Sequence, residues 1–289
     1  MLEDVHVTLG HLRESGDRYV RSALANQNRD GLGIDAATRW LRREDTAVHG
    51  LRYAMAMRHI VAMGGGGFLM EPETPALDDY ALALTNKEHP RVCLLPTASG
   101  DADRVIDAFY SAFPRERALA MHLSLFRRQR GDLRRRLMDN DMIYVGGGNT
   151  ANMLAVWRLH GMDEMLSDAW KAGVVIAGVS AGACSLFEGC ITDSFGPGLA
   201  ALEDGLGLLS GTFCPHYDGE VRRRPRYHQL VEEGLAGGLA ADDGAAVHFV
   251  GQNLHKVVSS RSTALAYRVH RESGVHEESL DTHFLGASP

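Results

Sequence analysis

A serine lies between two glycines in the segment Gly178–Gly182, whose sequence is GVSAG. An apolar run, VVIA, precedes the segment, and small residues compatible with a helix start follow it. A strand, a sharp turn and a helix in this order are typical of a nucleophile elbow, where small neighbours let the backbone bend and leave the serine exposed. The pattern predicts that Ser180 is a nucleophile and that the N–H group of Ala181 faces the oxyanion of acyl transfer. The alternative is a tight turn whose glycines serve packing only.

A second glycine cluster, Gly146–Thr150 with the sequence GGGNT, follows another apolar run. One of its bare amides could supply a second oxyanion donor, and Thr150 could cap the helix that follows. The alternative is a phosphate-binding turn. However, neither this cluster nor Gly64–Gly67 satisfies G-x-G-x-x-G, and G-x-x-x-x-G-K-[ST] is also missing from the sequence. These spacings disfavour nucleotide binding.

A serine hydroxyl becomes a good nucleophile when a neighbouring imidazole accepts its proton. His216 stands out among the 14 histidines because it ends a strand-like segment and follows Pro215. The histidine in turn needs a carboxylate that holds its tautomer. Asp193 lies between the serine and the histidine, which is the order typical of nucleophile-elbow hydrolases. Spacing alone does not choose between Asp193 and three rivals: Asp218, Glu220 and Asp243.

The composition excludes several other classes of protein. A net charge of −7 and a pI near 6.0 disfavour an extended nucleic-acid surface. No apolar run reaches the length of a transmembrane helix, and the N-terminus lacks a signal-peptide pattern. The four cysteines show no metal-ligand spacing, so we expect reduced thiols and a cytoplasmic location. No motif indicates a metal or another cofactor.

Apolar runs and helical patterns alternate along the chain from Met57 onwards. Strands are predicted at 57–63, 92–95, 142–145 and 174–177, and helices at 101–113, 150–159 and 163–171. We therefore expect an α/β fold with a mainly parallel, doubly wound sheet flanked by helices on both faces. Shorter strand patterns at 245–249, 255–259 and 264–269 predict an antiparallel edge near the C-terminus.

Residues 1–56 differ in composition from the rest of the chain, being charged, arginine-rich and without a recognisable motif. We expect an N-terminal extension there, loosely attached or partly helical, followed by a catalytic domain at 57–289. Alternatively, Met55 or Met57 is the true start. Limited proteolysis that left the extension uncut would count against a loose attachment.

Three motifs together resemble the peptidase E family of bacterial aspartyl dipeptidases. They are VGGGNT at 145–150, GVSAGA at 178–183 and the pair Pro215–His216. The interval from Gly148 to Ser180 (180 − 148 = 32) also matches that family. The resemblance covers roughly residues 58–270. It implies a fold shared with cyanophycinase and, more distantly, with class I glutamine amidotransferases.

The resemblance also implies roles for single residues. Ser180 would be the nucleophile, His216 the general base, and the amides of Gly148 and Ala181 the oxyanion hole. An aspartate shortly after the elbow would be the acid.

That description fits Asp193, with two residues fewer after the elbow than the family pattern has. The alternative acid is Asp243, which precedes a glycine on a late strand where the family has glutamate. We favour Asp193. The resemblance further implies that Asn149 and Arg222 bind substrate, the arginine by pairing with the side-chain carboxylate of an N-terminal aspartyl residue through a bidentate fork.

We therefore expect a serine-type peptidase that hydrolyses short peptides, including N-terminal aspartyl dipeptides, through an acyl-enzyme. One alternative is a cyanophycinase-like hydrolase of β-aspartyl-arginine, and another is a non-catalytic relative that binds a small molecule. An amidotransferase would need a cysteine in place of Ser180. The expected partner is a small peptide, with neither nucleic acid nor membrane, and a homodimer is compatible with the sequence.

Overall fold

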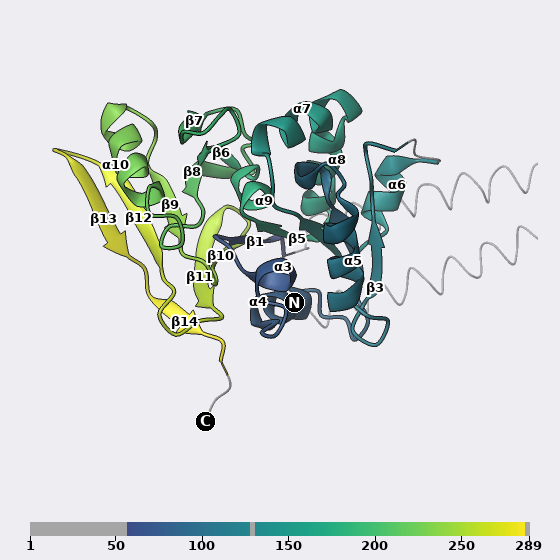
Figure 1. The fold of residues 1–289 in the computed structure, drawn as a ribbon. Helices are drawn as coiled ribbons and strands as arrows, with labels where there is room; N and C mark the ends of the chain where they lie inside the picture. The colour runs from purple at the N-terminus through teal and green to yellow at the C-terminus, as the bar shows by residue number, and fades with distance from the viewer. Residues whose placement is uncertain (1–56, 128–130, 287–289) are drawn as a thin grey trace, which may run out of the picture. The chain divides into compact units, whose positions relative to one another are not determined.

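The structure is a computed structural model that describes residues 57–127 and 131–286 (Figure 1). The predicted extension at 1–56 and the alternative start at Met55 lie outside the described residues. In the described part of the chain, no helix combines the length and the apolar character needed to cross a membrane.

An eight-stranded sheet forms the centre of the described domain, in the order β14-β11-β10-β1-β5-β4-β2-β3. Its last five strands are parallel to their neighbours. They are β1 (His59–Met63), β5 (Val175–Val179), β4 (Met142–Val145), β2 (Arg91–Leu95) and β3 (Leu119–His122). The predicted parallel sheet is thus confirmed, although β3 was not predicted.

The other end of this sheet is antiparallel, as predicted. Strand β10 (Ala245–Val250) pairs antiparallel with β1 and with β11 (Asn253–Ser259), and the short β14 (Thr282–Phe284) lies parallel to β11. The strand predicted at 264–269 does not join this edge. It forms β12 (Ala266–Arg271), which belongs to a second sheet.

Side chains alternate between the two faces of the eight-stranded sheet, so each strand contributes to two cores. In β1, Ile60 and Ala62 pack in one cluster, and Val61 and Met63 in the other. The helices α3 (Gly67–Met70), α4 (Ala76–Ala83) and α5 (Asp103–Ala112) cover the second face. The first is covered by α6 (Leu133–Met138), α7 (Thr150–His160) and α8 (Met162–Lys171). Figure 1 shows α3 and α4 below the sheet and α7 above it.

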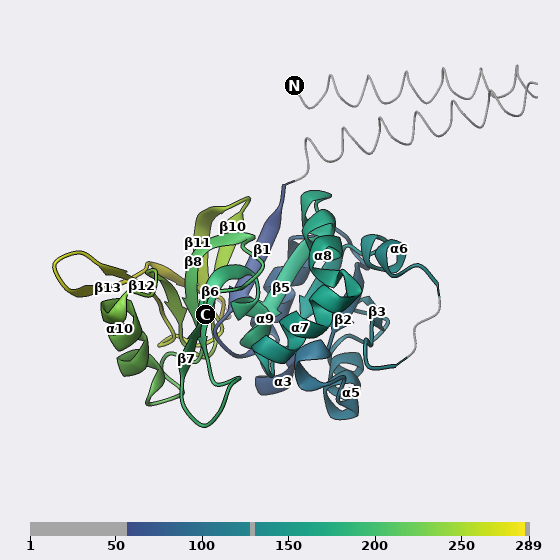
Figure 2. The same cartoon turned by 90° about the horizontal axis from the view of Figure 1, so that it is seen from above.

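The second sheet has six strands among the described residues, in the order β13-β12-β9-β8-β6-β7. Its strands besides β12 are β6 (Phe187–Thr192), β7 (Ala200–Leu202), β8 (Leu209–Cys214), β9 (Gly238–Ala241) and β13 (Val275–Ser279). The helix α10 (Arg223–Glu233) connects β8 to β9 and packs against this sheet. Figures 1 and 2 show β13 and β3 at opposite ends of the domain. Of these six strands, β8 and β12 correspond to strand segments that the sequence predicted, and the other four do not.

The chain leaves the elbow differently from the prediction. The helix α9 (Ala181–Cys184) comprises four residues, and β6 begins at Phe187. The helix-compatible segment after the elbow is thus helical only at its start, because Phe187 belongs to a strand. Phe187 stacks on Phe213 of β8 with ring centroids 5.0 Å apart, and this packing draws the chain from the first sheet into the second.

Candidate active site

Ser180 occupies the sharp turn between β5 and α9. Its φ of 53° and ψ of −114° lie in a sparsely populated region that costs on the order of 1–3 kcal/mol for a residue with a side chain. Its N–H group donates to the carbonyl oxygen of Met63 at 3.0 Å, which ties the turn to the end of β1. A β-carbon at residue 182 would collide with the carbonyl oxygen of Val145 in β4. Gly182 is therefore required because the elbow packs directly against the neighbouring strand.

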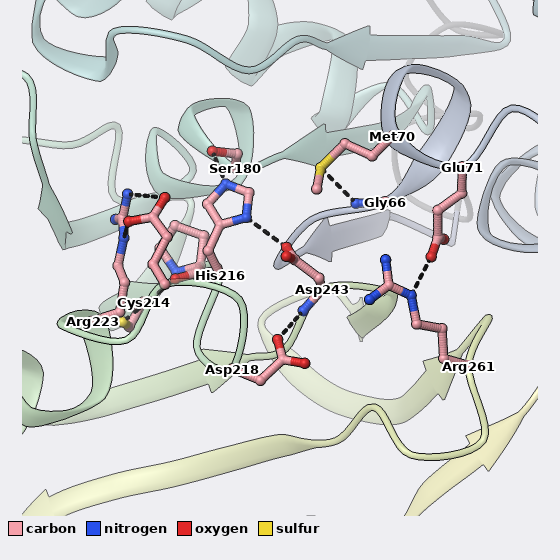
Figure 3. Close-up of polar contacts among 12 residues, drawn as sticks. Gly66, Met70, Glu71, Ser180, Cys214, His216, Asp218, Arg223, Asp243 and Arg261 are labelled. Carbon is pink, nitrogen blue, oxygen red and sulfur yellow. Dashed lines mark hydrogen bonds and ion pairs between the residues drawn. The ribbon is translucent and has the colours of Figure 1, made fainter.

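His216 approaches the serine from the second sheet, two residues after β8. Its Nε2 lies 2.8 Å from Oγ of Ser180 (Figure 3). The backbone of His216 also has a positive φ, 51°, and its N–H group donates to the carbonyl oxygen of Gly64 at 3.2 Å. The loop after β1 thus holds the histidine against the elbow. The structure brings together the serine and the histidine that the sequence singled out.

The carboxylate beside His216 belongs to Asp243. Nδ1 of His216 lies 2.6 Å from Oδ1 of Asp243. Asp243 sits in the turn between β9 and β10 and forms an isolated parallel bridge with Gly65. Strand β10 runs beside β1, so its first residues arrive next to the loop that holds the histidine. The late-strand alternative to Asp193 is the residue that the fold brings to the imidazole.

Asp193, the favoured acid, is not placed beside the histidine. It is exposed at the end of β6, in the loop that leads to β7, and lines a separate cavity described below. The preference for Asp193 is therefore corrected in favour of Asp243. The physical reason is the strand topology. The loop after β6, which carries Asp193, lies against the start of α7, whereas the turn before β10, which carries Asp243, lies beside the end of β1. Of the other rivals, Asp218 accepts the N–H of Asp243 at 2.8 Å through Oδ1, and Glu220 pairs with Arg223.

Two glycines leave room for the contact between histidine and aspartate. A β-carbon at residue 65 would collide with Oδ1 of Asp243 and lie 2.9 Å from Nδ1 of His216. At residue 219 a β-carbon would collide with Oδ2 of the same carboxylate. The sequence analysis noted the Gly64–Gly67 run only as a failed nucleotide motif. Its position directly after the first strand was the available signal.

The carboxylate of Asp243 is held in its ionised form. Burial raises its pKa, but the hydrogen bond and charge of His216 and the positive charges of Arg261 and Arg223 outweigh that effect, so the pKa lies below its ordinary value. Nε of Arg261 donates to Oε1 of the buried Glu71 at 2.5 Å. Figure 3 shows this pair on the side of Asp243 opposite the imidazole. Neither residue was singled out from the sequence.

The loop after β4 lies against the serine. A β-carbon at Gly147 would be 3.4 Å from Cβ and 3.9 Å from Oγ of Ser180. Ala181 is the first residue of α9, where a helix N–H has no partner within the helix. Among the residues that the structure describes, the N–H groups of Gly147, Gly148 and Ala181 donate to no acceptor. These amides are available to an oxyanion, and Gly147 joins the predicted Gly148 as a candidate.

Asn149, a predicted substrate ligand, uses its side chain within the protein. Its Oδ1 accepts from the N–H of Asn152 at 2.8 Å and caps α7. Its Nδ2 donates to the carbonyl oxygen of Ser194 at 3.1 Å. Asn149 therefore links the glycine loop to the loop after β6, and its substrate contact stays a prediction.

Arg222, the other predicted substrate ligand, lies immediately before α10 and is exposed. It lines a cavity of about 530 Å³ between the 193–199 loop and residues 220–226. The N–H of Glu220 donates to the carbonyl oxygen of His216 at 3.1 Å, so one wall of the cavity starts at the histidine. The other wall is tied to Asn149. The two walls are thus hydrogen-bonded to His216 and Asn149, and the volume of the cavity suits a small ligand.

Tyr217 anchors the loop on the far side of the histidine. Its hydroxyl lies 2.9 Å from Nε2 of His228 in α10 and donates to Glu277 of β13. Burial, the hydrogen bond and the negative charge of Glu277 raise the pKa of Tyr217 well above its ordinary value, so the phenol stays protonated. Arg224 lies over the ring with its guanidinium carbon 5.3 Å from the ring centroid. Nothing in the sequence indicated this network.

The arrangement as a whole can support nucleophilic catalysis. Ionised Asp243 accepts a hydrogen bond from the N–H group at Nδ1 of His216, which leaves Nε2 free to accept the hydroxyl proton of Ser180. Neighbouring main-chain donors can stabilise a developing oxyanion. Within the described residues, no group of three or more His, Cys, Asp or Glu side chains is arranged to hold a metal ion.

Comparisons with known proteins agree with this chemistry. The profile of peptidase family S51 matches residues 60–257. A curated relative from Bacillus subtilis (strain 168), named "Uncharacterized peptidase YgaJ", is 53% identical over 232 residues, which make up 80% of this chain and 100% of the relative.

Two solved structures share the fold. A peptidase from an acI-B1 Actinobacterium has a TM-score of 0.58 and 19% identity, over 78% of this chain and 95% of the other. A protein from Listeria monocytogenes EGD-e that is described as a peptidase E has a TM-score of 0.52 and 18% identity, over 78% of this chain and 100% of the other. At these identities the likeness concerns the fold alone.

Proposed function

The chain belongs to peptidase family S51, and we propose that it cleaves short peptides with Ser180 as nucleophile, His216 as general base and Asp243 as the acid. Membership of the family makes the protein an enzyme and a peptidase. The observation that carries the residue roles is the continuous line of contacts, 2.8 Å from Oγ to Nε2 and 2.6 Å from Nδ1 to Oδ1.

The reaction is acyl transfer to water in two steps. Nε2 of His216 takes the hydroxyl proton as Oγ of Ser180 bonds to the scissile carbonyl carbon. The C–N bond then breaks, and the departing amine receives that proton from Nε2. In the second step the imidazole deprotonates a water molecule that attacks the ester, and Oγ leaves with the proton. Asp243 stabilises the imidazolium in both steps and is not protonated itself.

The main-chain N–H of Ala181 and that of Gly148, beside Gly147, stabilise the negative oxygen of the tetrahedral intermediate. Their freedom from other acceptors supports this role, because a donor already used within the protein would have to give up its bond. Removing one such donor typically costs about 3–4 kcal/mol of transition-state stabilisation. The strained turn at Ser180 serves the same end by presenting Oγ and the amide of residue 181 to one point in space.

We propose N-terminal aspartyl dipeptides as substrates. Arg222 lines the bordering cavity and forms no side-chain hydrogen bond or ion pair with any described residue, so its guanidinium is free to bind a carboxylate. A bidentate contact with an aspartyl side chain would use the planar fork of arginine. The four free, buried thiols support the accompanying proposal of a reducing, cytoplasmic location.

The test is the Ser180→Ala variant, assayed on a library of short peptides. We expect turnover to fall to background, a loss on the order of 10⁶-fold in kcat, because no other group in the site can form the acyl-enzyme. The fold should persist, since the substitution removes one oxygen atom. Ser111→Ala, an exposed serine on α5, is the matched control.

Unchanged turnover by purified Ser180→Ala would contradict the proposed mechanism. The same library reports the substrate. Cleavage of β-aspartyl-arginine in preference to aspartyl dipeptides would replace the proposed substrate by that of a cyanophycinase-like enzyme and leave the residue roles intact.

A further inference from the structure

Asp218 contacts the proposed acid from the same loop that carries the histidine. Its carboxylate forms no hydrogen bond with the imidazole, whose two nitrogens face Asp243 and Ser180. Instead, Oδ1 of Asp218 accepts the main-chain N–H of Asp243 at 2.8 Å (Figure 3). Since Asp218 follows His216 by two residues, one short loop bonds to both the main chain and the side chain of Asp243.

Three consecutive residues of this loop bond to the end of β9 and to the turn that follows it. Nδ1 of His216 lies 2.6 Å from Oδ1 of Asp243, and the N–H of Tyr217 donates to the carbonyl oxygen of Ala241 at 3.1 Å. The bond that Asp218 accepts from Asp243 completes the series. The loop is therefore fastened to the turn at each of these three residues.

The N–H of Asp243 depends on a side chain for its hydrogen bond. The neighbouring N–H groups of the turn donate to main-chain carbonyl oxygens: Asp242 to Leu265, Gly244 to Gly65 and Ala245 to Asp242, each at 3.0 Å. In the described part of the chain, the N–H of Asp243 has no such main-chain acceptor. Main-chain bonds thus hold the turn on either side of Asp243, whereas the N–H of residue 243 itself is held by Asp218.

We propose that Asp218 is a positioning residue, which fixes the carboxylate of Asp243 against the imidazole of His216 by holding the main chain of Asp243. This inference rests on the proposed function and adds to it a residue that sets the geometry of the proposed triad. The bond at Oδ1 of Asp243 orients the side chain, and the bond at its N–H limits movement of the backbone. A displacement of about 1 Å at a catalytic group can cost about 100-fold in rate, so the second bond bears directly on turnover.

A positive charge compensates for the proximity of the two carboxylates. Burial lowers the pKa of Arg261, but the hydrogen bond and charge of Glu71 and the charges of Asp243 and Asp218 outweigh that effect, so the pKa is raised. Arg261 thus interacts favourably with both carboxylates. Its charge offsets the repulsion that two neighbouring carboxylates exert on each other.

The experiment compares Asp218→Ala with Asp218→Asn in the full-length protein, on a peptide that the unaltered protein cleaves. Alanine removes the acceptor, so we expect kcat to fall about 10- to 100-fold with little change in KM. Asparagine keeps an Oδ1 that can accept the same N–H, so this variant should retain most of the turnover. Asp107→Ala, at an exposed aspartate of α5, is the matched control.

Two kinetic results would overturn the inference. One is wild-type kcat in Asp218→Ala, and the other is a loss in Asp218→Asn as large as that in Asp218→Ala. Because Asp218 is exposed, the fold should persist in both variants. If the alanine variant does not fold, Asp218→Ser replaces it, since the serine hydroxyl stops one bond short of the position of Oδ1.

A measurement without turnover separates this inference from the proposed function. The proton on Nδ1 of His216 should give a far-downfield NMR resonance because it is hydrogen-bonded to a carboxylate. We expect that resonance to persist in Asp218→Asn and to move upfield in Asp218→Ala. An unchanged resonance in Asp218→Ala would exclude the positioning role and leave the peptidase mechanism standing. If the unaltered protein cleaves no peptide, the proposed function fails, and the resonance still decides whether Asp218 positions the pair.

Discussion

The eight-stranded and the six-stranded sheet contribute unequally to the site. The first supplies Ser180, the proposed nucleophile, through one strand–turn–helix segment, β5 to α9. The second supplies the histidine from the end of β8, and the aspartate comes from the turn where β9 of one sheet leads to β10 of the other. The hydroxyl is thus positioned by local backbone geometry, whereas its two partners depend on contacts between segments far apart in the chain.

This difference shows why Ser180, His216 and Asp243 could not be predicted equally well from the sequence. An elbow is a continuous pattern of residues, and its glycines are required by packing within a few ångströms. The contact of His216 with Asp243 joins residues 27 positions apart and depends on the loop at Gly64 and Gly65. We call the contact region of His216, Asp243 and the loop at Gly64 and Gly65 the seam between the two sheets. Substitutions in this seam should have the most informative effects.

Asp243→Asn should produce the largest effect at the seam. An asparagine cannot stabilise the imidazolium and can hold the wrong tautomer, so we expect kcat to fall on the order of 10⁴-fold. Asp193→Asn, at an exposed residue on the wall of the separate cavity, should leave kcat close to its wild-type value. Steady-state kinetics of both variants tests the assignment, with Asp107→Asn on the exposed side of α5 as the control. A larger loss of kcat in Asp193→Asn than in Asp243→Asn would restore Asp193 as the acid.

Gly65→Ala should have an intermediate effect. Its methyl group would occupy the space of Oδ1 of Asp243, so the carboxylate or the imidazole must move by about an ångström. Misplacement of that size can cost about 100-fold in kcat/KM. The control is Gly274→Ala, because a β-carbon at Gly274 meets no atom within 4 Å. Wild-type activity in Gly65→Ala would show that the seam tolerates such displacement.

The smallest effect is a pH-dependent change in stability. It arises at the antiparallel edge of the eight-stranded sheet and not at the seam. At that edge, Nε2 of His248 in β10 lies 2.9 Å from Nδ1 of His59. Its Nδ1 lies 2.7 Å from the hydroxyl oxygen of Tyr80. Burial, followed by the charges of neighbouring His59, His255 and Lys256, lowers the pKa of His248 from 6.5 to about 4.

Because that pKa is lowered, the unfolded chain binds a proton at a higher pH than the folded chain does. The contribution of His248 to the free energy of unfolding should therefore decrease as pH falls from about 6.5 to 4, by up to roughly 3 kcal/mol. Asp243, whose pKa is also lowered, stays ionised through that window and does not contribute to the loss.

Urea unfolding at pH 7 and pH 4.5 measures the effect. His248→Gln, which does not titrate, should reduce the acid-induced loss, and His160→Gln at the exposed end of α7 should leave it as it is. An identical loss in His248→Gln would assign the acid sensitivity to another group.

Much of the first sheet was predictable because its signals are local. The apolar runs at β1, β2, β4 and β5 and the helical patterns of α5, α7 and α8 were correctly assigned. The family resemblance read from three short motifs is confirmed, as is the expectation of a peptidase. The second sheet was largely missed. Its strands are short, and three of its five pairings join strands that other elements separate in the chain.

Single residues show the same division. The GVSAG segment alone singled out Ser180 as a candidate, since the sharp turn demands small neighbours wherever it occurs. His216 needed the family motif in addition, because a place after Pro215 at the end of a strand-like segment is a weak signal among 14 histidines. The choice of Asp243 over Asp193 followed only from the pairing of β10 with β1, which carries one carboxylate to the imidazole and leaves the other at the cavity wall. Chain order constrains a turn of five residues, but distances between remote side chains are set by how the strands pair and pack.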